Sequence, residues 1–130
     1  MITVDAALRA HNRLIDLFGG SKGIRDKDLL DSALNRPFAT FDNIDLYPTA
    51  IEKAVALLES IAINYPFVDG NKRTAYTLME VILRHGKFIP IATQEEKYNL
   101  VIKVCIGEYR FEEIKLWLLA NCKPLSTKIK

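Results

Sequence analysis

Cysteine is scarce in this chain of 130 residues, because only Cys105 and Cys122 occur. The two do not form a C-x-x-C pair or any other spacing that is typical of a metal site. Isolated cysteines in apolar surroundings are usually buried free thiols. The sequence therefore predicts neither a disulfide framework nor a zinc site, and it favours a protein of the reducing cytoplasm.

An excess of charge of one sign is also missing. Lysine and arginine number 18 against 16 acidic residues, so the formal net charge is +2. Such a balance does not favour general binding to nucleic acid, for which the lysine-containing tail after Pro124 is the only support. No apolar run approaches the roughly 20 residues of a membrane span, and no signal peptide is visible. We expect a soluble cytoplasmic protein without a membrane partner.

No internal repeat, low-complexity tract or linker divides the sequence. At this length we expect a single domain over residues 1–130, which should bury about two-thirds of its unfolded surface. Apolar residues recur at helical spacing in about six segments. Two of these segments, 51–63 and 75–83, are apolar nearly all round, as is typical of the central helices of a bundle. The predicted fold class is an all-α bundle of about six helices.

The connection over residues 38–47 has no sustained period and mixes aromatic, polar and aliphatic residues. It is longer than most connections between helices, and long loops are often functional. The sequence leaves two interpretations open: a functional flap, as a loop or a short β-hairpin, or a plain connector.

Residues 65–75 form a polar, turn-rich interruption between two apolar helices. Pro66 disfavours helical geometry at the preceding residue, so it should end the first helix. Asp69 and Gly70 are a turn pair. The second helix should then open at Asn71.

The first turn of this second helix carries Lys72 and Arg73. Cations at a helix N-terminus oppose the macrodipole at a cost of about 0.3–1 kcal/mol each when exposed. Free N–H groups and cations together favour a polyphosphate site over a merely solvated first turn. Asp69 directly precedes this turn and is suited to Mg²⁺, which needs few carboxylates. The pattern is not a Walker A loop, because G-x-x-x-x-G-K-[ST] is absent.

Residues 65–75 resemble the active-site motif of the Fic/Doc family in its death-on-curing form, H-P-F-x-D-G-N-K-R-T-A, at ten of eleven positions. Residues 19–26 resemble the family's G-G-x-x-G-I-R-D segment, and residues 30–37 its L-x-x-A-x-x-R-P segment. The resemblance covers roughly residues 4–86. It implies a Fic/Doc helical bundle and ATP as co-substrate.

Family members of the death-on-curing type are toxins that transfer phosphate from ATP to a hydroxyl of a protein, with elongation factor Tu as the known target. Fic-type members transfer AMP instead and usually have G-N-G-R, where this chain has Lys72. The resemblance thus favours the kinase over AMPylation. It also implies that the flap over residues 38–47 positions the target by strand-like pairing.

The resemblance implies a role for each motif residue. Asp69 would hold Mg²⁺, while Asn71, Lys72 and Arg73 would bind phosphates. Backbone amides around Gly70 would complete the anion site, and Phe67 would anchor the loop in the core. His11 is not assigned to catalysis: it falls on the apolar stripe of the first helix and is predicted to be a hydrogen-bonded core histidine.

The departure from the motif is Tyr65, which stands where the family has its catalytic histidine. An imidazole can accept a proton at neutral pH, whereas a phenol, with an ordinary pKa near 10, cannot. Losing a positioned base typically costs about 10²–10⁴-fold in rate. We therefore expect slow transfer of phosphate, or else a pseudoenzyme that binds a nucleotide or a partner. The tyrosine at this position is either natural or an introduced change.

Regulation is expected to come from another chain. The sequence contains no S/T-x-x-x-E-G/N motif, the signature of the inhibitory helix that some Fic proteins carry. The resemblance therefore implies an antitoxin that acts in trans.

Overall fold

The computed structural model describes residues 1–125, so the lysines of the tail after Leu125 lie outside the described residues. The helices are α1 (Val4–Phe18), α2 (Lys27–Asn35), α3 (Ala50–Asn64), α4 (Asn71–His85), α5 (Gln94–Cys105) and α6 (Phe111–Asn121), with a short 3₁₀ turn, η1 (Arg36–Phe38). The predicted all-α bundle is confirmed. Within the described residues, no helix is long and apolar enough to cross a membrane.

Local capping explains where most of these helices begin. The Thr3 side chain accepts from the N–H of Ala6, and the Asp26 side chain caps α2 in the same way. Thr49 and Thr93 each form a capping box with the glutamate three residues later. The helix α4 is different: it follows Gly70, has no side-chain cap and has no acidic residue in its first turn.

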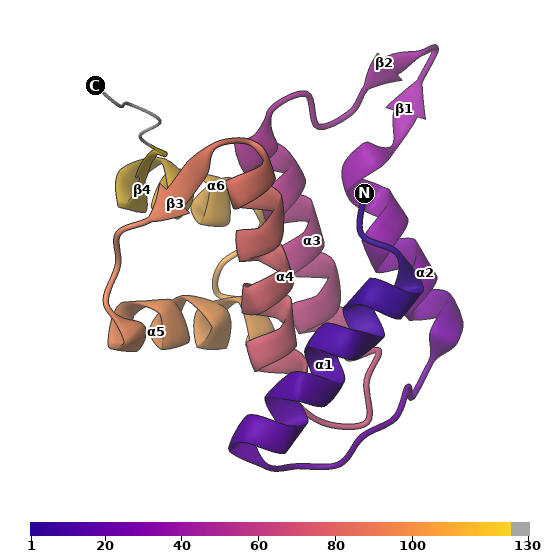
Figure 1. Cartoon of the computed structure of the whole chain (residues 1–130). Coiled ribbons are helices and arrows are strands. Elements are labelled where there is room, and N and C mark those ends of the chain that lie inside the picture. The colour runs from indigo at the N-terminus through magenta and orange to yellow at the C-terminus, as the bar shows by residue number, and fades with distance from the viewer. Residues whose placement is uncertain (126–130) are drawn as a thin grey trace, which may run out of the picture.

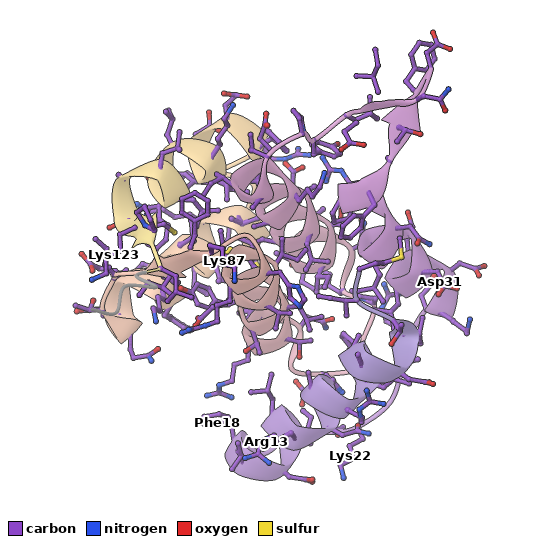
Figure 2. The ribbon with its side chains drawn as sticks, turned by 45° about the horizontal axis from the view of Figure 1, so that its top comes forward. Arg13, Phe18, Lys22, Asp31, Lys87 and Lys123 are labelled. Atoms are coloured by element: carbon purple, nitrogen blue, oxygen red, sulfur yellow. The ribbon has the colours of Figure 1, made fainter. Side chains whose placement is uncertain are left out.

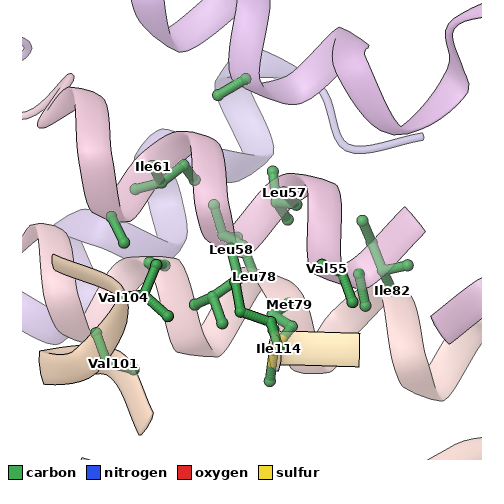
Figure 3. Close-up of a cluster of buried hydrophobic side chains, with 14 of the residues drawn as sticks. Val55, Leu57, Leu58, Ile61, Leu78, Met79, Ile82, Val101, Val104 and Ile114 are labelled. Atoms are coloured by element: carbon green, nitrogen blue, oxygen red, sulfur yellow. The ribbon is translucent and has the colours of Figure 1, made fainter. Parts of the chain in front are cut away.

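The helices α3 and α4 lie side by side at the centre, with α1 and α2 on one side and α5 and α6 on the other (Figure 1). Every residue of α3 from Ala54 to Ala62 is buried. Leu57, Leu58 and Ile61 of α3 meet Leu78 and Met79 of α4 in one continuous cluster (Figure 3). Side chains of α5 and α6 join the same cluster: Leu100, Val101, Val104, Ile114 and Leu118.

Two small antiparallel sheets complete the fold. Strands β1 (Thr40–Phe41) and β2 (Ile44–Asp45) form the flap hairpin, which projects away from the bundle (Figure 1). Phe41 and Ile44 are each 70% exposed. The short β-hairpin that was one expected form of residues 38–47 is confirmed. Strand β3 (Phe88–Pro90) pairs with β4 (Cys122–Pro124), a strand that the sequence did not predict.

A buried carboxylate links the base of the flap to the bundle. Glu59 of α3 contacts Arg36 at 2.9 Å and Arg110 at 3.0 Å. The guanidinium of Arg36 also donates to the Tyr47 hydroxyl and to Ser60 Oγ. Burial alone would lower the pKa of Arg36, but its bonds to Tyr47 and Glu59 outweigh burial and raise it. Both ends of the flap are therefore tied to α3.

The two cysteines are free, but they are half-buried rather than fully buried as expected. Burial raises the pKa of the Cys105 thiol, and burial together with nearby Glu80 raises that of Cys122 to about 11. Because the thiolate is the reactive form, neither thiol is set up as a nucleophile.

Candidate functional site

The segment between α3 and α4 is clamped at its first residue. Tyr65 caps α3 in a left-handed conformation (φ 50°, ψ 60°), which is uncommon for a bulky side chain. The Arg25 side chain donates from Nε to the Tyr65 carbonyl at 2.7 Å and from Nη2 to the Asn64 carbonyl at 2.6 Å. These bonds satisfy carbonyls at the end of α3 and fix where the Tyr65 side chain leaves the backbone.

The loop from Gly19 to Asp26 runs along this segment and pairs with it. Ile24 and Phe67 form an isolated antiparallel bridge, and the Val68 N–H donates to the Gly23 carbonyl at 3.0 Å. The N–H groups of Arg25 and Asp26 both donate to the Pro66 carbonyl. Two of the three segments that carry the family resemblance, residues 19–26 and residues 65–75, are therefore neighbours in space, and one supports the other.

Phe67 anchors the loop in the core, as predicted. Its side chain is 1% exposed and stacks on His11, with ring centroids 4.1 Å apart and an interplanar angle of 6°. His11 is fully buried, and its Nε2 donates to the Asp69 carbonyl at 2.7 Å. His11 is thus the hydrogen-bonded core histidine that the sequence predicted, and it positions the loop from behind.

Asn71 has a use that the sequence did not reveal. Its side-chain oxygen accepts from the Phe67 N–H at 2.9 Å, and its side-chain nitrogen donates to the Phe67 carbonyl at 3.0 Å. The amide group therefore closes the loop on itself. What Asn71 offers a phosphate in this conformation is its backbone N–H.

The start of α4 presents free donors. Within residues 1–125, the backbone N–H groups of Asn71, Lys72 and Arg73 have no hydrogen-bond acceptor. Gly70 takes the positive φ of 73° that the turn requires, but its own N–H donates to Asp69 Oδ1 at 2.8 Å. We call the three free N–H groups, with the side chains of Lys72 and Arg73, the anion seat. Its partial and full positive charges attract phosphate groups.

The carboxylate of Asp69 lies beside the anion seat and is oriented by hydrogen bonds from backbone N–H groups. Besides the bond to Gly70, its Oδ2 accepts from the Ser21 N–H at 3.2 Å. A Cβ at Gly20 would lie only 2.8 Å from the same oxygen, so this approach requires glycine. Each oxygen keeps a lone pair for a metal. No cluster of three metal-binding side chains exists in the described residues.

An open cleft of about 850 Å³ lies over the anion seat. This size falls in the range of small-molecule sites. The cleft brings together all the predicted site residues, from Tyr65 to Arg73. It also has walls that the motif did not indicate: the end of α1, with Leu14 and Phe18, and one face of α5, with Gln94, Lys97 and Tyr98. Only tertiary packing joins these residues to the motif.

The cleft lacks an evident base. No histidine lines it among the described residues. Burial and the charge of Glu80 raise the pKa of Tyr76, so this phenol stays protonated. Glu80 is itself paired with Arg84 at 2.8 Å. Tyr65 is 42% exposed and stands at the position from which the motif's histidine would act. The described residues of the cleft therefore offer donors and cations that can bind an anion, but no evident group that can abstract a proton.

Comparisons with known proteins show the family of this chain. The sequence model of the Fic/DOC family matches residues 1–83. A curated protein, Toxin Doc of Mycolicibacterium smegmatis, is 54% identical over 59 residues, which are 45% of this chain and 45% of that protein. The match to the toxin thus spans less than half of either protein. Because the family model covers more than half of the sequence, this chain belongs to the Fic/DOC family.

Proposed function

We propose that this protein binds ATP with Mg²⁺ and transfers phosphate to a hydroxyl of a target protein, at a rate that Tyr65 keeps low. The observation that carries the proposal is the anion seat: three free N–H groups beside Lys72 and Arg73, next to the oriented carboxylate of Asp69. Asp69 would hold the metal, which would neutralise phosphate charge when bound. The anion seat would bind and orient the phosphates.

The choice of phosphate transfer over AMP transfer rests on Lys72 and on the similarity to a protein called Toxin Doc. The flap supports a protein target, because exposed Phe41 and Ile44 stand on a short hairpin with a free edge. An extended segment can add to such an edge as a further strand. Elongation factor Tu, the target that the family resemblance implies, is the first protein to test.

A second function is favoured by one specific observation. Tyr65 replaces the base, and no histidine lines the cleft in the part of the chain that the structure describes. Binding without transfer would make the protein a nucleotide-dependent pseudoenzyme. Incubation with labelled ATP and lysate separates the two functions, since only the transferase labels a protein.

Asp69→Asn tests the metal site. The asparagine keeps an oxygen that can accept from Ser21 or Gly70, but it lacks the charge that holds Mg²⁺. Calorimetry should show that Mg²⁺ tightens ATP binding to the unmutated protein by about tenfold or more, or about 1.4 kcal/mol, and that the variant loses this gain.

The matched control for this experiment is Asp31→Asn on α2, away from the cleft (Figure 2). It should bind ATP with the full gain from Mg²⁺. Equal ATP affinity with and without the metal in the unmutated protein would refute the role of Asp69.

We further propose that an antitoxin binds this protein in trans. The rim of the cleft exposes apolar side chains that a partner segment could cover, including Phe18 and Val68 at 58% and 54% exposure. Co-expression with the product of the neighbouring reading frame, followed by pull-down, should recover a complex. Toxicity that persists without any complex would count against this partner.

A further inference from the structure

The side chain of Arg73 packs against an aromatic ring. Its guanidinium carbon lies 4.2 Å from the ring centroid of Phe18, the last residue of α1. Within residues 1–125, the Arg73 side chain makes no ion pair and no hydrogen bond. Phe18 stands at the end of α1, on the side that faces α4 (Figure 2). Among the described residues, the ring of Phe18 is therefore the one specific polar or aromatic partner of the Arg73 side chain.

The C-terminal end of α1 is also an electrostatically favourable environment for the positive charge of Arg73. In the first turn of α4 the guanidinium opposes that helix's dipole, and no acidic residue there compensates. The last turn of α1, in contrast, carries no basic residue of its own. By reaching the ring of Phe18, Arg73 brings a cation to a C-terminal helix end, where cations are stabilising.

The contact with Phe18 leaves the hydrogen-bond donors of Arg73 free. Within residues 1–125 none of the five N–H donors of the guanidinium is engaged in a hydrogen bond, and the ring of Phe18, 4.2 Å from the guanidinium carbon, offers no oxygen or nitrogen acceptor. Phe18, Arg73 and Lys72 all line the cleft above the anion seat. The ring therefore limits the orientations of the guanidinium without occupying a phosphate-binding donor.

We propose that Phe18 is a positioning residue that holds Arg73 ready to bind the phosphates of a nucleotide in the cleft. The proposal rests on the proposed function, because it assigns Phe18 to the same site. It also gives a reason for a phenylalanine that is 58% exposed at a helix end. Phe18 itself acts only through Arg73.

A double-mutant cycle tests this coupling by calorimetry, with ATP–Mg²⁺ and inorganic triphosphate as separate probes. Phe18→Leu keeps an apolar side chain but removes the aromatic face. An exposed cation–π contact corresponds to about 2- to 5-fold in affinity, so we expect this loss for both probes. Phe18→Trp should restore the affinity. In an Arg73→Ala background, Phe18→Leu should have no further effect.

Leu17→Ala is the matched control, because Leu17 is the preceding residue, is 61% exposed and does not line the cleft. It should bind both probes like the unmutated protein. Unchanged affinity in Phe18→Leu, or a loss that persists without Arg73, would overturn the proposal.

The two proposals fail differently. Binding of triphosphate without binding of ATP would refute the proposed function, while the cycle with triphosphate still decides the role of Phe18. Binding of neither probe to the unmutated protein would refute both.

Discussion

Tyr65→His is expected to raise the rate of phosphate transfer by about 10²-fold or more, which corresponds to about 2.7 kcal/mol of barrier. The variant supplies a base that is largely neutral at pH 7, at the rim of the cleft that holds the anion seat. The backbone should accept the change, because histidine adopts the left-handed conformation of this position more readily than most residues. The Arg25 clamp binds backbone carbonyls and does not depend on the side chain.

The measurement is transfer of label from ATP to protein in a lysate, together with ATP affinity and growth on expression. Affinity should change little, and growth arrest should follow where the host contains the target. The control is Tyr65→Phe, which should match the unmutated protein if the phenol has no role. A histidine variant that binds ATP normally yet transfers no label would favour the pseudoenzyme. A loss of activity in the phenylalanine variant would give tyrosine itself a role.

Local sequence signals were enough to predict the helix boundaries around the candidate site. Pro66 and Gly70 mark the end of one helix and the start of the next, and the structure has both boundaries there. The predicted first turn with Lys72 and Arg73 and without an acidic residue is present at the start of α4. The family resemblance implied that Phe67 anchors the loop, and the structure has its side chain buried.

The sequence could not reveal contacts between distant segments. The Arg25 clamp joins residues about 40 positions apart, and nothing in the sequence indicated that the side chain of Asn71 bonds to Phe67. Nothing local marks Cys122 as part of a strand, because β4 exists only through its pairing with β3. For the same reason the wall of the cleft from α5 was missed: its residues show only helical periodicity.

Phe67→Ala is expected to destabilise the protein by about 3–5 kcal/mol, the range for truncating a large aromatic residue in a core. The ring is 1% exposed and stacks on His11, so its loss leaves a cavity between α1 and the motif loop. The His11 ring would also lose the surface that holds it against the Asp69 carbonyl. Since the anion seat depends on this loop, ATP affinity should fall as well.

Urea denaturation measures the first effect, and calorimetry under native conditions measures the second. Val68→Ala is the matched control, because Val68 is the next residue in the same loop but is 54% exposed. Surface substitutions of this kind usually change stability by less than about 0.5 kcal/mol. Equal urea midpoints for the two variants would show that Phe67 does not anchor the loop. A destabilised Phe67→Ala that binds ATP with unchanged affinity would show that the anion seat forms without this anchor, through the hydrogen bonds that Asn71 and the loop from Gly19 to Asp26 make with the segment.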